Sequence, residues 1–223
     1  MTTGLWWMMS KDLLCEISGK RSWPSMMLLG IVVAVVFALQ AQLPQEQRNQ
    51  MCGVLLWVTI LFAGLLGIDR SCSSEQDDGC WEALLAYPVS PAAVYWSKLL
   101  VNVLSLTLLE ILLIPAFGTF AGVRILNPIA AIVPLTFAAN FGIAALGTLL
   151  SALTNRLGLS GQLLAVLVLP LMIPVILAAA EGTRLIALGR IDEEWWRWFQ
   201  FLIGFALIFV TVGSILFEFV VEE

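Results

Sequence analysis

Residues that could do chemistry are concentrated in one polar stretch of this chain, residues 69–98. The stretch holds five acids and two bases between long apolar segments. A calcium-binding loop would need acids at alternating positions, a glycine sixth and a glutamate twelfth, and the run Glu75 to Asp78 lacks that spacing. The simpler interpretation is a group of acids at the N-terminus of a short helix, where the helix dipole stabilises negative charge.

That short helix is predicted over residues 81–86. Asp78 or Gly79 would cap its N-terminus, and it would end before Pro88 because the residue before a proline avoids the helical region. A second helix then begins with Pro91 as its first residue. The apolar face of the short helix consists of Trp81, Leu84 and Leu85. We therefore expect the polar stretch to form a compact elbow that lies flat at a membrane surface.

Several other kinds of site are excluded by composition. The sequence has no histidine, and its four cysteines form no C-x-x-C pair, which excludes a Cys/His zinc site and covalent haem attachment. The Gly19-Lys20 pair is followed by Arg21, where a P-loop requires serine or threonine. We therefore expect no catalytic residues, no metal, no bound cofactor and no ATP hydrolysis in this chain.

Glu110 is the one acid deep inside an apolar segment, in the sequence LLEILLIPAF. An acidic side chain at the centre of a membrane costs about 3 kcal/mol on insertion scales, so Glu110 is a candidate functional residue. The alternatives are a protonated glutamate packed between helices, or a carboxylate beside a water-filled cleft. Asn102, Asn140 and Gln162 are interpreted as hydrogen-bonding groups between helices rather than as substrate ligands.

The composition requires lipid around most of the chain. Of its 223 residues, 60% are hydrophobic and 12% are charged, which is more apolar surface than a soluble domain can bury. The net charge of −5 argues against a nucleic-acid partner, which needs a basic surface. The polar loops are too short for a separate soluble domain, so we predict one membrane domain over residues 1–223.

The apolar segments predict an all-α integral membrane protein with six transmembrane helices, because an open backbone in lipid would leave its polar groups unpaired. About 20 residues at about 1.5 Å per residue cross a hydrocarbon core of about 30 Å. The predicted spans are residues 24–43, 51–68, 91–120, 125–153, 157–180 and 198–221. Residues 1–23 are predicted to form an interfacial helix. Lys20 and Arg21 also fit a signal peptide, but the long leading segment without a cleavage site favours an uncleaved helix.

Small residues and prolines predict how the later spans pack. Gly118 and Gly122 have a GxxxG spacing, typical of close helix packing or a dimer interface. A similar line of small residues in the fourth span consists of Ala138, Gly142, Gly147 and Ser151. Pro170 and Pro174 should kink the fifth span, either as a hinge or as a static bend. The loop that ends in DEEWWRW predicts an interfacial tryptophan belt or a partner-binding surface.

Basic residues give little information on orientation. With the N-terminus inside, six Lys and Arg residues fall on the inner side and five on the outer side. The first span alone has three against one, which favours a cytoplasmic N-terminus. Six spans then place the C-terminus and the elbow on the cytoplasmic side as well.

Two ordered motifs lie within residues 50–180. The first contains a Trp, an acid-Arg pair, a D-G-x-x-E element, a Leu pair, a proline and Ser-Lys, at Trp57, Asp69-Arg70, Asp78 to Glu82, Leu84-Leu85, Pro88 and Ser97-Lys98. The second is LVLPLMIP, at residues 167–174. In both motifs the sequence resembles the B-subunit permease of the haem-exporter ABC transporter of cytochrome c maturation (system I), a permease of the ABC-2 type.

The resemblance implies a dimerised six-helix permease with two copies of a separate ATP-binding subunit on its cytoplasmic side. The D-G-x-x-E helix would be the coupling helix, and its docking surface would consist of Asp78, Gly79, Trp81, Glu82 and Leu85. The elbow around it would contain Asp69, Arg70, Pro88 and Lys98. Cys80 stands where the family more often has serine, and Glu110 lies outside the family pattern.

The resemblance also implies a function in the bacterial inner membrane, namely haem export or ATP-driven release of a haem-loaded chaperone. A haem-handling membrane subunit and a haem chaperone would be partners, haem would be the cargo of the complex, and ATP would bind to the partner subunit. An ABC-2 permease for another cargo, such as a lipid or drug, would share the elbow. A secondary transporter would need more coupling-ion groups than Glu110, and a non-transporting assembly scaffold is the third alternative.

Overall fold

In the computed structural model, every described element is an α-helix. The backbone is described for residues 22–39, 44–77, 91–123, 125, 128–156 and 161–222, and side chains for a smaller set within these ranges. The helices are α2 (Ser22–Ala38), α3 (Gln45–Asp77), α5 (Pro91–Ala121), α6 (Ile129–Arg156), α7 (Gly161–Ala187) and α8 (Glu193–Glu222). Within these ranges there is no strand, so the prediction of an all-helical protein is confirmed for this part of the chain.

Five of the helices, α3 and α5 to α8, are long and apolar enough to cross a membrane. Helix α2 has 17 residues, and its apolar part is Pro24–Val36. At about 1.5 Å per residue α2 is about 26 Å long, slightly less than a hydrocarbon core of about 30 Å. The five later spans are therefore supported by length and composition, and the first span of the predicted six stays a prediction.

The polar stretch begins inside a helix. Helix α3 has 33 residues and is about 50 Å long, so it continues past its candidate membrane span, Gln45–Gly67, through residues 68–77. The prediction that Glu75 and its neighbours stand at a helix N-terminus is wrong for residues 75–77, which form the C-terminal end of α3. The reason is that no proline or glycine interrupts the chain between Gly67 and the Asp78-Gly79 pair.

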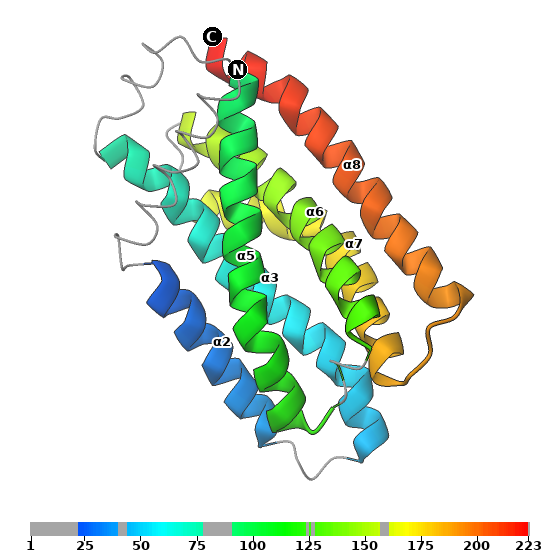
Figure 1. Cartoon of the computed structure of the whole chain (residues 1–223). Helices are drawn as coiled ribbons and strands as arrows, with labels where there is room; N and C mark the ends of the chain where they lie inside the picture. The colour runs from blue at the N-terminus through cyan, green and yellow to red at the C-terminus, as the bar shows by residue number, and fades with distance from the viewer. Residues whose placement is uncertain are drawn as a thin grey trace.

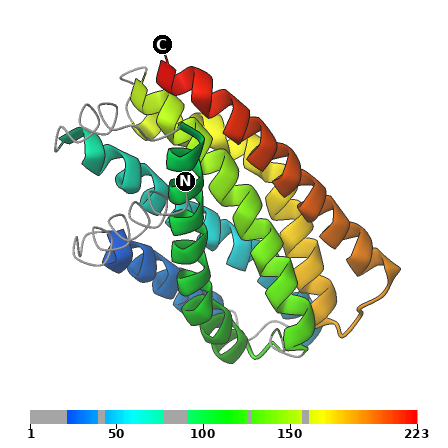
Figure 2. The ribbon, with the colours of Figure 1, turned by 45° about the horizontal axis from the view of Figure 1, so that its top comes forward.

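The six helices form one bundle with α6 near its centre (Figures 1 and 2). Helix α6 packs against α5, α7 and α8, and α3 packs against α2 and α7. The ends of α2, α5 and α7 lie at what we name the loop end, where α3, α6 and α8 begin. At the opposite end, named the elbow end, α3 ends and α5 begins. The two helices that flank the polar stretch are therefore antiparallel members of the same bundle.

Helix α2 is attached to the bundle through two glycines. A Cβ atom at Gly67 of α3 would lie 2.9 Å from Met26 Sδ, and one at Gly30 of α2 would collide with the Leu113 side chain of α5. The outer face of α2 is apolar and exposed and contains Leu28, Ile31, Val32 and Val35. Such a face needs lipid or another apolar partner.

Two helices end in the same glycine cap. Gly122 follows α5 with φ 64°, and the Val123 N–H donates to the Gly118 carbonyl at 3.0 Å, as in a Schellman motif. Gly189 follows α7 with φ 71° and a matching bond from the Arg190 N–H to Leu185. The helix cap explains why a glycine stands at position 122, and the interpretation of the GxxxG spacing as a packing or dimer motif stays a prediction.

The line of small residues in α6 does mark close packing. A Cβ atom at Gly142 would lie 3.3 Å from Phe205 Cδ1 of α8 and 3.8 Å from Val175 Cγ1 of α7. Its companions Ala138, Gly147 and Ser151 are also buried within the chain. The predicted packing is confirmed, but these residues face neighbouring helices of the same chain and not a dimer interface.

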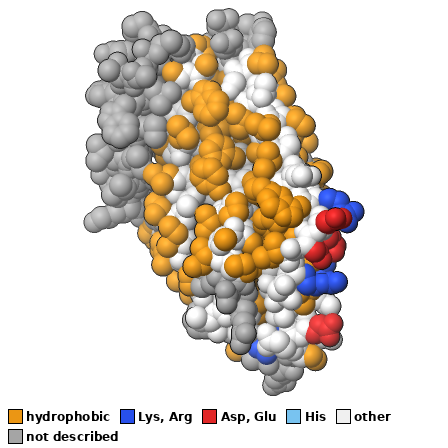
Figure 3. Space-filling model, turned by 45° about the vertical axis from the view of Figure 1, so that its right-hand side comes forward, with side chains coloured by type: hydrophobic (Ala, Val, Ile, Leu, Met, Phe, Trp, Pro, Cys, Tyr) orange, Lys and Arg blue, Asp and Glu red, His pale blue; other side chains and the backbone are white. Residues whose placement is uncertain are grey.

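Helix α7 is continuous through Pro170 and Pro174. The predicted kink of this helix stays a prediction. The helix also extends past the predicted end at residue 180, to Ala187, and Glu181 and Arg184 form an ion pair of 2.6 Å on this extension. Figure 3 shows a broad apolar face with the visible charged side chains gathered in one region.

Candidate functional site

The predicted docking surface falls outside the described residues, and α3 and α5 show how it is attached to the bundle. The predicted residues outside the described part are Asp78, Gly79, Trp81, Glu82, Leu85 and Pro88. Asp69 and Arg70 lie in the helical extension of α3, with only their backbone described. Helix α5 begins at Pro91, as predicted. In the chain, the predicted docking surface therefore stands between the end of α3 and the start of α5.

Lys98 lies within α5 and not in the loop before it. It stands seven positions after Pro91 (98 − 91 = 7), or about 10 Å along the helix, and only 4% of it is exposed. A buried ammonium group requires a polar partner or access to water. Lys98 therefore lies on the helix that was predicted to begin at Pro91, with its side chain buried near the elbow end, and its role in the elbow stays a prediction.

Helix α3 is joined to α7 by a buried hydrogen bond. The indole Nε1 of Trp57 donates to Thr183 Oγ1 at 2.9 Å, and the Thr183 hydroxyl donates to the Ala179 carbonyl at 2.8 Å. One turn earlier on α3, Gly53 faces the Ala180 carbonyl so closely that no Cβ atom could be accommodated. Trp57 is fully buried, and a buried indole N–H needs such an acceptor. These contacts fix the position of α3 against α7.

Helix α5 is joined to α6 by two groups of polar side chains. Asn102 Nδ2 of α5 donates to Thr148 Oγ1 of α6 at 2.9 Å. Two turns away, Asn140 Nδ2 of α6 donates to Glu110 Oε2 at 2.8 Å and to Thr107 Oγ1 at 3.3 Å. The predicted roles of Asn102 and Asn140 between helices are confirmed. The side chain of Gln162 lies outside the described residues.

Tyr95 joins the elbow end of α5 to α8. Its hydroxyl lies 3.4 Å from the Ala145 carbonyl of α6 and 3.5 Å from the Phe209 carbonyl of α8. Its ring is fully buried and packs against Phe217, with the ring centroids 5.5 Å apart. The Tyr95 hydroxyl fills the space next to Gly213, where a Cβ atom would collide with it.

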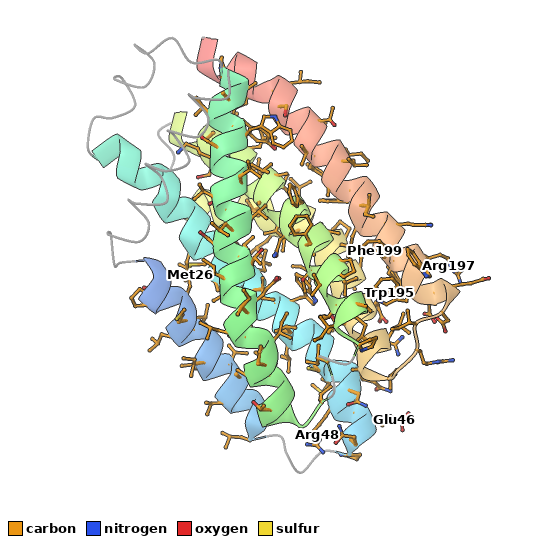
Figure 4. The ribbon with its side chains drawn as sticks, viewed as in Figure 1. Met26, Glu46, Arg48, Trp195, Arg197 and Phe199 are labelled. Atoms are coloured by element: carbon orange, nitrogen blue, oxygen red, sulfur yellow. The ribbon has the colours of Figure 1, made fainter. Side chains whose placement is uncertain are left out.

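The loop end carries an aromatic cluster at the start of α8. Trp195 stacks on Phe199 with centroids 5.2 Å apart and is buried, whereas Trp196 is 53% exposed and Arg197 points away from the bundle (Figure 4). Trp196 suits the predicted interfacial belt, but Trp195 belongs to the core. Sequence reasoning began this helix at residue 198 and missed the N-cap, Asp192, whose Oδ1 accepts the Glu194 N–H at 3.1 Å.

These features define a class of protein. The chain is a multi-pass α-helical membrane protein whose helices are joined in pairs by buried polar side chains, with a polar stretch between two long spans. Among the described residues, no group of three or more Cys, Asp or Glu side chains could hold a metal ion.

Comparison with known sequences identifies the family. A sequence model described as CcmB protein matches residues 3–222, and this chain therefore belongs to the CcmB protein family. The family resemblance inferred from the motifs is thereby confirmed.

Three curated relatives carry the name heme exporter protein B. The protein from Pseudomonas aeruginosa is 28% identical over 179 residues, covering 79% of this chain and 78% of its own. The protein from Rhodobacter capsulatus is 30% identical over 157 residues, 69% of each chain. The protein from Bradyrhizobium diazoefficiens is 27% identical over 192 residues, 83% of this chain and 81% of its own.

Proposed function

We propose that this chain is the permease subunit of an ABC transporter in cytochrome c maturation, with haem as the cargo of the complex. Membership of the CcmB family carries this proposal, together with relatives named heme exporter protein B. A separate cytoplasmic subunit would bind and hydrolyse ATP, and this chain would transmit its movement. The complex would release haem or a haem-loaded chaperone on the outer side, together with a haem-handling membrane partner.

The helix pairs support a mechanical role. Closure of two ATP-bound subunits would displace the elbow, which continues directly into α3 and α5. Helix α3 would carry α7 with it through Trp57 and Thr183, and α5 would carry α6 through Asn102 and Asn140. Because packed helices have discrete arrangements, a small shift at the elbow can change the state of the whole permease.

The same arrangement supports a cytoplasmic C-terminus. Helix α8 runs from the loop end to the elbow end, so its C-terminal end lies at the same end of the bundle as the end of α3 and the start of α5 (Figure 1). We place this end of the bundle on the cytoplasmic side of the bacterial inner membrane, together with the N-terminus. A second copy of this chain would accompany the second ATP-binding subunit.

Charge reversal at the proposed docking surface tests this function. In Glu82→Lys we expect an ATP-binding subunit to be lost from the affinity-purified complex, and cytochrome c maturation to fall with it. The matched control is Glu46→Lys, which reverses an exposed charge in the first turn of α3, at the loop end of the bundle. The control should retain both the companion proteins and the maturation activity.

Two results would contradict the proposal. Undiminished binding of the ATP-binding subunit by Glu82→Lys would show that the docking assignment is wrong. Purification of the unaltered chain from native membranes with an ATP-binding subunit, but without haem-handling proteins or a haem spectrum, would point to another cargo.

A further inference from the structure

Glu110 and Asn140 form a polar pair at the middle of the bundle. Glu110 stands 11 positions before the end of α5 (121 − 110), and Asn140 stands 11 positions after the start of α6 (140 − 129). Each residue therefore lies about 16 Å from the loop end of its helix, close to half of a hydrocarbon core of about 30 Å. Only 2% of Glu110 and 0% of Asn140 is exposed.

The hydrogen bonds around the pair fix the orientation of the amide. The Thr107 hydroxyl donates to the Val103 carbonyl at 2.7 Å, so its oxygen is an acceptor for other groups. The Asn140 atom that lies 3.3 Å from this oxygen must therefore be the donor, Nδ2. The same nitrogen donates to Glu110 Oε2 at 2.8 Å. In this orientation the remaining polar atom of the amide is the acceptor Oδ1.

Two buried oxygen atoms of the pair have no hydrogen-bond partner among the described residues. They are Glu110 Oε1 and Asn140 Oδ1. Both are acceptors when Glu110 is ionised, so neither can pair with the other. An ionised Glu110 would also hold a full charge in apolar surroundings with one of its oxygens unpaired, which is strongly unfavourable.

We propose that Glu110 and Asn140 together bind one proton. The proton, taken from water, forms an O–H bond at Glu110 Oε1, and this group donates to Asn140 Oδ1. The Asn140 Nδ2–H group donates in return to Glu110 Oε2, as observed. The result is a cyclic carboxylic acid–amide pair, in which a single proton satisfies both of the unpaired oxygens.

No described charge lies close enough along the helices to provide another partner. Helix α5 packs against α2, α3, α6 and α8. On α5 itself Lys98 stands 12 positions away (110 − 98), or about 18 Å. The described charged side chains of the four packed helices lie at the loop end and are Glu46, Arg48, Glu193, Glu194 and Arg197. Other titratable groups of these elements are Tyr95 and Cys52, toward the elbow end and the loop end.

The proton determines whether a charged or a neutral group is exposed when α5 and α6 separate. With the proton bound, separation exposes a neutral acid and a neutral amide. Without it, separation would leave an ionised carboxylate in the middle of the membrane. The bound proton therefore removes the cost of leaving a charge in the membrane if α5 and α6 separate.

The pH dependence of reversible unfolding tests the proton site. The unaltered protein and Glu110→Gln are unfolded in mixed micelles between pH 5 and pH 7, above the ordinary glutamate pKa of about 4.3. The folded protein retains the proton and the unfolded chain releases it, so the folded state binds one more proton and stability falls as pH rises. Relative to Glu110→Gln, the unfolding constant should rise about tenfold per pH unit.

A ratio of the two unfolding constants that does not change with pH would mean that Glu110 has the same charge in the folded and unfolded states. A flat ratio together with an infrared spectrum that contains only carboxylate stretches would overturn the proposal. The control is Glu193→Gln, which replaces an exposed acid in the first turn of α8. The ratio of its unfolding constant to that of the unaltered protein should not change with pH. Glu110→Gln should itself fold, since a second amide can make the same two hydrogen bonds with Asn140.

Infrared spectroscopy gives a second readout that does not need reversible unfolding. The difference spectrum between the unaltered protein and Glu110→Gln, in lipid at neutral pH, should contain the carbonyl stretch of a carboxylic acid. That band should shift in D₂O, because its O–H is hydrogen-bonded. A difference spectrum with only the carboxylate stretches would contradict the proposal.

Discussion

The two central helix pairs of the bundle are joined in different ways. Between α3 and α7, Gly53 meets the backbone of Ala180 directly, and one side-chain hydrogen bond, Trp57 to Thr183, follows a turn later. Between α5 and α6, the two shorter described hydrogen bonds join side chains, Asn102 to Thr148 and Asn140 to Glu110. These two contacts are eight positions apart on each helix (110 − 102 and 148 − 140), or about 12 Å. A longer hydrogen bond joins the Tyr95 hydroxyl to the Ala145 carbonyl.

This difference indicates how each pair can move. A backbone contact at a glycine has no adjustable side chain, so α3 and α7 can separate only as a whole. Side-chain hydrogen bonds can change rotamer or partner, so α5 and α6 have more freedom to shift relative to one another. We therefore expect α3 and α7 to behave as one rigid unit and the α5–α6 contact to be the more adaptable of the two.

The largest effect should follow from a methyl group at the rigid contact. The Cβ atom of Gly53→Ala would collide with the Ala180 carbonyl oxygen and lie 3.1 Å from its carbon, so the helices must separate. Overpacking of this kind costs about 2 kcal/mol. The difference in unfolding free energy between Gly53→Ala and the unaltered protein, measured in mixed micelles, gives this cost.

Gly204→Ala is the matched control, because Gly204 also lies inside a helix and nothing approaches within 4 Å of a Cβ atom there. Replacing a helical glycine by alanine should stabilise the control by up to about 1 kcal/mol. Equal effects of the two substitutions would show that the close contact between α3 and α7 does not constrain the bundle.

The next effect should come from the α5–α6 contact. Asn140→Leu removes the donor to Glu110 Oε2 and leaves the acid without a partner among the described residues. A buried polar group that loses its partner costs about 1–3 kcal/mol, and the same micelle titration should show that loss. In Glu110→Leu/Asn140→Leu both partners are apolar, so most of the stability should return. A double variant less stable than Asn140→Leu would contradict this account.

Much of the helix content could be predicted from the sequence, but the ends of the helices could not. Apolar runs are sufficient to predict a span in lipid, and Pro91 marks the start of α5 as expected. The extension of α3 through residues 68–77 was missed because polarity was taken as the end of the helix. The start of α8 was missed for the same reason, although Asp192 is a typical N-cap.

The site was predicted only in part, for a physical reason. A polar side chain in an apolar span must find a partner, so Asn102, Asn140 and Glu110 could be identified individually. Which atoms meet depends on the register of α5 against α6. Glu110 and Asn140 are 30 residues apart in sequence, and nothing in the apolar pattern specifies that register.

The smallest expected effect is the coupling energy of a single hydrogen bond, measured by a double-mutant cycle in the α3–α7 pair and in the α5–α6 pair. Trp57→Phe with Thr183→Val measures the α3–α7 bond, and Asn102→Leu with Thr148→Val measures the α5–α6 bond. Interhelical bonds in membrane proteins give coupling energies of about 0.6 kcal/mol, rarely above about 1.7. Because Gly53 already holds α3 against α7, Trp57 and Thr183 should remain aligned in the single variants and show the larger coupling. If the Asn102–Thr148 coupling is instead larger, α5 and α6 are the more rigidly held pair, and the movable contact must be sought between α3 and α7.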